Sequence, residues 1–168
     1  MTVEENKRIV RRAIERVFNA ADPQAIEALY AVDFVNHTPP SEPDVHGIEG
    51  VKRMAALWHV AFPDLQCRVD DEIAEGDRVM TRWTMRGTHL GTFRGLPPTG
   101  RLLTGWAMEV SRIEGDKIAE QWLLWDTLDM LLQLGALSPP LPSTSHPHSP
   151  STAPREPGRA LAGDDRVG

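Results

Sequence analysis

The residue best suited to chemistry in the sequence is Asp126, which ends an apolar strand pattern and precedes a helical one. Alternation with a period of two places Trp122, Leu124 and Asp126 on one face of that strand. Apolar surroundings raise the pKa of an aspartate from about 3.9 towards the neutral range, because burial removes water from the charged form. An aspartate with such a pKa is able to move protons as a general acid or base.

The same residue has a structural alternative. Asp126 precedes Thr127, Leu128 and Asp129, an arrangement typical of a helix N-cap that accepts backbone N–H bonds. Capping lowers the pKa of a carboxyl group, whereas apolar burial raises it. Spacing alone therefore leaves open whether Asp126 caps the last helix, acts as a catalyst, or does both.

Composition narrows the class of protein. The 168 residues, 40% of them hydrophobic, fit one domain, and a net charge of −6 with scattered Lys and Arg argues against a nucleic-acid surface. Cys67 is the single cysteine, which excludes an intrachain disulfide. Residues 1–12 lack the apolar core of a signal peptide, and no run approaches transmembrane length. We expect a cytoplasmic protein that binds neither nucleic acid nor membrane.

Hydrophobic periodicity predicts helices first and strands afterwards. Three helices are predicted before residue 63, the first with capping-box spacing at Thr2 and Glu5, and an extended Pro-rich loop is predicted over residues 33–45. From Leu65 the period changes to two, and a last helix ends near Gly135. This order predicts an α+β domain over residues 1–137, in which a curved, mixed or antiparallel sheet wraps around the N-terminal helices as a cone with a pocket.

Two further features concern the partners of this domain. Residues 138–168 are rich in Pro and Ser and contain no aromatic residue, which predicts a disordered tail. The strand predicted over residues 101–113 is apolar on both faces, as in a sheet covered once by helices and once by another subunit. We therefore predict a homodimer.

Few polar side chains are available to the pocket. They are Asn36, His37, His59, Thr81, His89, Glu109, Gln121 and Asp126. Each has a structural alternative: a lone histidine often bonds loop carbonyls, and Glu109 has Arg82 and Arg112 as candidate ion-pair partners. Motifs for metal, nucleotide or serine-hydrolase chemistry are missing, namely His-x-x-x-His, GxGxxG, the P-loop and GxSxG. Cofactor-free acid/base catalysis or simple ligand binding remains.

Longer motifs add a family resemblance. Residues 87–101 read GTHLGTFRGLPPTGR and residues 112–122 read RIEGDKIAEQW, with Asp126 four residues after Trp122. FVNH at 34–37 precedes them, and QLG at 133–135 follows. Over roughly residues 5–137 the chain resembles the SnoaL-like polyketide cyclase family.

The resemblance implies a cone-shaped α+β barrel of the nuclear transport factor two superfamily, usually dimeric. The founding cyclases close a ring by intramolecular aldol condensation of a polyketide ester, without metal or cofactor. In them an aspartate that corresponds to Asp126 takes an acidic carbon-bound proton and returns one to the product. The acidic or histidine partner usual in the family appears here as Glu109.

These observations predict a site for a hydrophobic, carbonyl-rich small molecule, with no cofactor and no metal. We expect Asp126 and His37 to be catalytic. We expect the substrate-binding residues to be Asn36, His59, Trp83, His89, Glu109 and Trp122. The alternatives are an isomerase or an epoxide hydrolase on the same fold, the latter needing paired aspartates bridged by a pocket arginine, or a binding protein without chemistry.

Overall fold

The structure of the chain is a computed structural model that describes residues 1–37 and 43–138. In chain order its elements are α1 (Val3–Ala13), the π-helical turn η1 (Ile14–Asn19), α2 (Pro23–Leu29), β1 (Tyr30–His37), β2 (Val45–His46), α3 (Gly47–Ala61), β3 (Gln66–Glu75), β4 (Arg78–Thr88), β5 (Leu102–Glu114), β6 (Lys117–Trp125) and α4 (Thr127–Leu134). Within the described ranges no helix is long and apolar enough to cross a membrane. The predicted tail lies, from residue 139 onwards, outside them.

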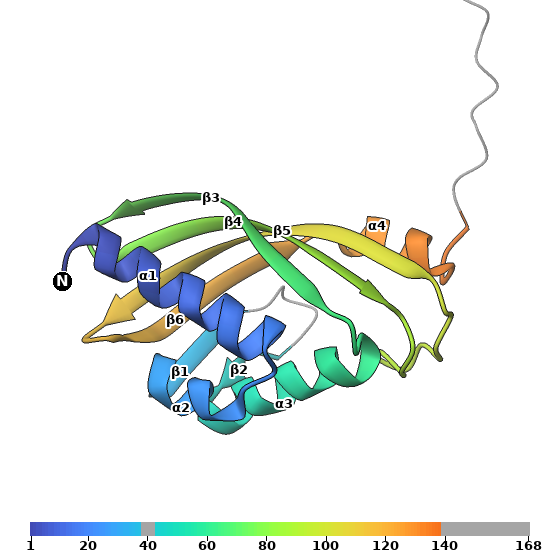
Figure 1. Cartoon of the computed structure of the whole chain (residues 1–168), viewed down its shortest axis with the longest axis horizontal. Helices are drawn as coiled ribbons and strands as arrows, with labels where there is room; N and C mark the ends of the chain where they lie inside the picture. Colours follow the sequence, from blue (N-terminus) through green and yellow to red (C-terminus); the bar gives the residue numbers. More distant parts are fainter. Residues whose placement is uncertain (38–42, 139–168) are drawn as a thin grey trace, which may run out of the picture.

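The frame of the molecule is one six-stranded sheet in the order β2-β1-β6-β5-β4-β3. Neighbouring strands are antiparallel except β1 and β6, which run parallel. The sheet curves over α1, α2 and α3, as Figure 1 shows, and it does not close, because β2 and β3 form its edges. The predicted α+β class with a curved mixed sheet around the N-terminal helices is confirmed.

The N-terminal helical segment begins with a cap on α1 and is joined to the sheet where η1 ends. Thr2 Oγ1 accepts the backbone N–H of Glu5, whose carboxylate accepts the N–H of Thr2, so the predicted capping box is present. At the other end Asn19 donates to the carbonyl of Cys67 at 2.8 Å and accepts its N–H at 2.6 Å. These two bonds join η1 to β3 and hold the apolar side of the helices against the concave face of the sheet.

The first strand departs from the predicted loop over residues 33–45. Tyr30–His37 forms β1, and it pairs in parallel with β6 so that Asn36 lies opposite Gln121. Pairing between segments so distant in sequence leaves no local pattern, and the prolines that follow His37 favour a loop. Residues 38–42 of the predicted loop lie outside the described residues.

The prediction of which face points inward is correct for β4 and wrong for β6. Thr81 and Trp83 are buried on the concave side of β4. On β6, however, Gln121 and Trp125 share that side with buried partners on β5, while Trp122 lies on the convex side. Both faces of β6 carry apolar residues, so alternation alone does not decide which one the helices cover.

Helix α4 continues the sheet where β6 stops. The side chain of Gln133 accepts the backbone N–H of Thr104 at 3.0 Å and donates to its carbonyl at 2.8 Å. It thereby satisfies the end of β5 that β6 no longer reaches. Gly135, with φ of 77°, closes α4 as the predicted left-handed C-cap.

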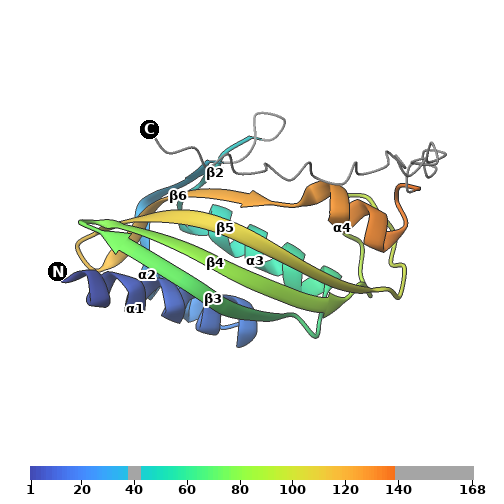
Figure 2. The same cartoon turned by 90° about the horizontal axis from the view of Figure 1, so that it is seen from above.

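Helices α1, α2 and α3 lie on one side of the sheet and leave the convex face of β5 and β6 uncovered (Figure 2). This face carries exposed apolar side chains. Trp106 is 47% exposed and Leu124 is 63% exposed, and Leu124 lies directly opposite Met108. A contiguous exposed patch of this kind marks an interaction surface. The predicted homodimer stays a prediction, and this face is the candidate interface.

We expect Trp106→Glu to convert a dimer to a monomer, because the introduced carboxylate loses its water in an apolar interface. Light scattering after gel filtration, over a dilution series, measures the mass. Val60→Glu is the matched control, because Val60 is an exposed apolar residue on α3. A wild-type monomer, or a Trp106→Glu variant that stays dimeric, would contradict the prediction.

Candidate functional site

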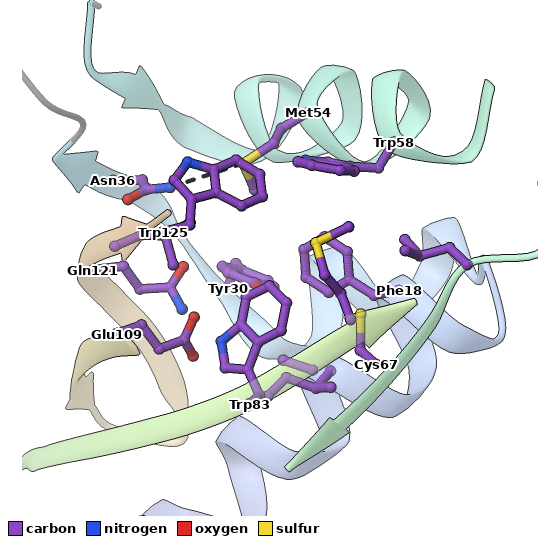
Figure 3. A pocket seen from close by; sticks show the side chains of 15 residues that line it. Phe18, Tyr30, Asn36, Met54, Trp58, Cys67, Trp83, Glu109, Gln121 and Trp125 are labelled. Carbon is purple, nitrogen blue, oxygen red and sulfur yellow. Dashed lines mark hydrogen bonds between the residues drawn. The ribbon is translucent and has the colours of Figure 1, made fainter. Parts of the chain in front are cut away.

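A cavity lies between the concave face of the sheet and the helices (Figure 3). Its walls are mostly apolar and aromatic, and three polar side chains of the sheet enter it, namely Asn36, Glu109 and Gln121. The other residues labelled in Figure 3 are Phe18, Tyr30, Met54, Trp58, Cys67, Trp83 and Trp125. A few polar groups converging in an apolar cavity are typical of a small-molecule site.

The cavity is narrow, and it adjoins a larger groove. Its volume is about 30 Å³, whereas the groove beside it measures about 420 Å³. Asn36, Met54, Trp58, Leu123 and Trp125 line both spaces and so form the boundary between them. A ligand of more than a few atoms therefore enters the cavity only when the side chains at this boundary move.

The carboxyl group of Glu109 is the ionisable group at the centre of the cavity wall. Glu109 is 7% exposed, and burial raises its pKa from 4.5 to about 7. Trp83 and Ser111 oppose the rise as donors, and the negative charge of Glu72 adds to it. A carboxyl group with a pKa near neutrality exchanges a proton readily under physiological conditions.

A short polar chain supports Glu109 from the neighbouring strand. Gln121 donates to the hydroxyl of Ser111 at 3.0 Å, and Ser111 in turn donates to Glu109 Oε1 at a longer 3.5 Å. Ser111 and Gln121 are directly opposite each other on β5 and β6. The contact from Ser111 is made to Oε1 of Glu109, and the indole N–H of Trp83 lies beside the carboxyl group and lowers its pKa.

Two further polar atoms at the cavity have no partner among the described residues. They are Oδ1 of Asn36 and the indole N–H of Trp83. The indole of Trp83 lies beside Glu109 in Figure 3 but falls short of hydrogen-bond geometry, and the amide of Asn36 makes one weak contact, 3.8 Å to Met54 Sδ. Buried polar groups are usually paired, so these two atoms are available to a polar group of a ligand.

Comparison with known proteins agrees with this arrangement. Residues 8–134 match the family model described as SnoaL-like polyketide cyclase. The chain belongs to this family. Curated protein sequences give no match. The family match covers every residue that lines the cavity, from Ala13 on α1 to Trp125 on β6.

Solved structures of SnoaL-like proteins share the fold, which is of the nuclear transport factor two type. TsrD from Streptomyces laurentii is 26% identical, with a TM-score of 0.73 over 82% of this chain and 99% of that one. IdmH from Streptomyces antibioticus, a proposed polyketide cyclase, is 33% identical, with a TM-score of 0.68 over 77% and 98%. AclR from Streptomyces galilaeus, a proposed hydroxylase, is 29% identical, with a TM-score of 0.72 over 82% and 85%.

Asp126 lies outside the cavity, at the exposed start of α4. Its carboxylate accepts the backbone N–H of Asp129 at 2.9 Å, which is the capping bond predicted as the structural alternative. The expectation that Trp122 and Leu124 surround Asp126 with the apolar wall of the pocket is wrong, because that wall is formed by the opposite face of β6. A catalytic role for Asp126 stays a prediction that its position does not support.

His37 also lies outside the cavity, in an ion-pair network on the convex side. Its Nδ1 is 3.0 Å from Asp44 and its Nε2 is 2.8 Å from Glu120, which also binds Arg112 at 2.9 Å. The ring stacks on Trp122, with centroids 5.1 Å apart. Hydrogen bonds to the two carboxylates raise the pKa of His37, and the bond to Glu120 has the larger effect. These contacts join the end of β1 to β2 and β6, so they explain His37 and Trp122 structurally.

The other predicted histidines are likewise used by the fold. His59 Nε2 lies 2.9 Å from the carbonyl of Val17, on the side of α3 that meets the N-terminal helices. His89 is fully buried against Phe62, and its Nδ1 lies 3.1 Å from Thr99 Oγ1. Neither lines the cavity. Of the residues predicted to bind substrate, the structure brings together Asn36, Trp83 and Glu109.

The arrangement needed for the epoxide-hydrolase alternative is not assembled at this cavity. Glu109 is the one carboxylate among the described residues that line it, and no arginine does so. Arg82 and Arg86 do not line it, and Arg82 pairs with Asp70 at 3.3 Å. Paired aspartates bridged by an arginine are therefore missing from the described part of the cavity.

Several cavity residues have no signal in the sequence beyond hydrophobicity. Met54 and Trp58 belong to the apolar stripe of α3, which predicts only that they face inward. Tyr30 reaches the cavity because β1 is a strand, and Trp125 because of the orientation of β6. The first depends on the pairing of β1 with β6 and the second on the pairing of β6 with β5, neither of which local patterns encode.

The raised pKa of Glu109 predicts a pH-dependent stability. In the pH range between the unfolded and folded pKa values, from about 4.5 to about 7, the folded state binds the extra proton, so stability is lost as pH rises. Full ionisation of Glu109 costs roughly 3 kcal/mol. We expect Glu109→Gln to remove this loss, so that denaturant unfolding shows the variant gaining on the wild type as pH rises. Glu75→Gln, at an exposed position on β3, is the control. Parallel pH curves for wild type and Glu109→Gln would refute the buried, titrating carboxyl group.

The cap predicts a different pattern at Asp126. Asp126→Ala removes the acceptor for the N–H of Asp129 and is expected to cost about 1 kcal/mol of stability, whereas Asp126→Asn keeps an acceptor and costs little. Thermal unfolding monitored by circular dichroism measures both. Equal losses for the two variants would show that the capping bond does not hold α4.

Proposed function

We propose that this SnoaL-like protein is a cofactor-free enzyme that closes a ring in a hydrophobic, carbonyl-rich small molecule by general acid/base catalysis, with Glu109 as the acid/base group. The observation that carries the proposal is the buried carboxyl group of Glu109, with its pKa raised to about 7, in an apolar cavity. Membership of a family named for polyketide cyclases supports this reaction class.

In the proposed reaction ionised Glu109 removes a proton from the carbon between two carbonyl groups of the substrate. The C–H bond breaks, and the electron pair becomes an enolate. The enolate carbon attacks a second carbonyl of the same molecule, so that a C–C bond forms and an alkoxide develops. Protonated Glu109 then returns its proton to that oxygen, and the group is ready for another cycle.

Donors at the cavity support charge stabilisation on the substrate. They are the unpaired indole N–H of Trp83, which lies beside Glu109, and the NH2 group of Asn36, whose one contact is the weak one to Met54 Sδ; an enolate oxygen is able to accept a hydrogen bond from either. Such donors act strongly in a site that excludes water, with one bond contributing about 3 kcal/mol to transition-state stability. Conjugated carbonyls of the substrate spread the remaining charge, and we therefore propose that no metal or cofactor takes part.

The substrate class follows from the walls of the cavity. Met54, Trp58 and Leu123 at the boundary give apolar and aromatic contacts, which suit the carbon skeleton of a polyketide-type ester. The adjoining groove offers room for the part of the substrate that does not react. Because the volume of the cavity is only about 30 Å³, we propose that substrate binding displaces the side chains at the boundary.

We expect Glu109→Gln to lower the rate of ring closure by about 10²–10⁴-fold, because the amide is unable to take the proton. Initial rates for a panel of linear poly-β-keto esters, followed by chromatography with mass detection, measure it. For the wild type, kcat/KM rises with pH around the pKa of Glu109. Asp126→Asn is the matched comparison: it removes one carboxylate and keeps the cap.

The comparison separates the two candidate bases. If Asp126→Asn abolishes turnover and Glu109→Gln does not, the family resemblance assigns the base correctly and the proposal for Glu109 is refuted. If compounds raise the melting temperature of the wild type and are all recovered unchanged, the protein binds ligands without chemistry. Retained folding of each variant is checked by circular dichroism.

A further inference from the structure

A row of three polar side chains crosses the sheet at Glu109. Glu72 on β3 lies directly opposite Thr81 on β4, and Thr81 lies directly opposite Glu109 on β5. Side chains at such positions are about 4.5–5.5 Å apart at Cβ. Thr81 is thus the residue between two carboxyl groups.

The row is buried, and its hydrogen-bonding capacity is not filled. The Glu72 side chain is 4% exposed, and its Oε2 accepts a hydrogen bond from Arg11 Nε at 2.5 Å. Its other oxygen, Oε1, and the hydroxyl of Thr81 are buried with no partner among the described residues. Buried carboxylates usually have all of their oxygens paired, and Glu72 has one that is not. Its presence in this row therefore needs an explanation other than packing.

The groups that face Glu109 come from several elements, and Glu72 differs from the others in carrying a negative charge that acts on Glu109. Tyr30 at the start of β1 and Cys67 on β3 both stay neutral, since burial raises the pKa of each, that of Cys67 to about 12. Ser111 and Gln121 are uncharged. Glu72 therefore supplies the negative charge that acts on Glu109 within the described residues, and Arg11 on α1 partly balances it.

We propose that Glu72 is a positioning residue for the reaction: held by Arg11, it acts across Thr81 to keep Glu109 partly protonated at neutral pH. The proposal rests on the acid/base role of Glu109 given above. A group that alternates between base and acid works best when both of its forms are populated. Glu72 thus adds to the effect of burial on Glu109 without touching the substrate.

The test follows the titration of Glu109 directly, in full-length protein labelled with ¹³C at glutamate carboxyl carbons, with Glu109→Gln identifying the signal. We expect Glu72→Gln to lower the titration midpoint by about 0.5 pH unit or more, and Arg11→Gln to raise it, because a negative charge is removed in the first and left unbalanced in the second. Glu75→Gln removes a carboxylate from the exposed side of the same strand and leaves the midpoint unchanged.

The pH profile of kcat/KM for ring closure is expected to move in the same directions. Midpoints that stay in place in both Glu72→Gln and Arg11→Gln overturn the inference, and the exposed position of Arg11 keeps that test usable if Glu72→Gln does not fold. Failure of the proposed function has a separate signature. In that case Glu109→Gln keeps its turnover, while the ¹³C titration still reports whether Glu72 acts on Glu109.

Discussion

The burial of one carboxyl group on the concave face of the sheet is the constraint on which the site depends. Placing an ionisable group in apolar surroundings costs free energy unless it is protonated or paired. Within the described residues Glu109 has a long contact to Ser111 and the indole N–H of Trp83 nearby, and no arginine or lysine lines the cavity with it. The fold therefore accepts a carboxyl group that is easily protonated, which is the property that proton transfer requires, in place of a more stable apolar residue.

The chain separates this chemistry from the elements that hold the sheet together. On the convex side, the network of His37 and Glu120 joins the end of β1 to Asp44, just before β2, and to β6. Asp126 lies at the point where β6 gives way to α4, and its capping bond starts the helix whose Gln133 completes β5. A carboxylate used in this way lies exposed at the start of a helix, whereas an acid/base group has to face the cavity, so cap and catalyst place opposite demands on one side chain.

Local patterns predicted most of the elements but only part of the site. The capping box at Thr2, the cap at Asp126 and the end of the last helix near Gly135 were readable, because each depends on residues close in sequence. The pairing of β1 with β6 could not be predicted from local patterns, and neither could the orientation of β6. Glu109 and Asn36 were among the candidates, yet their meeting in one cavity depends on that pairing. Residue type identified the groups, and topology decided which of them meet.

The same argument explains why family membership leaves the reaction open. Proteins of this fold include proposed cyclases such as IdmH and a proposed hydroxylase, AclR, so the curved sheet supplies a cavity and not a mechanism. The proposed mechanism depends on the polar atoms inside that cavity. Here these are the unpaired indole N–H of Trp83, the unpaired amide oxygen of Asn36 and the carboxyl group of Glu109. A donor, an acceptor and a protonatable oxygen on one wall match an enolisable carbonyl better than any saturated hydrocarbon, whose binding would leave all three unsatisfied.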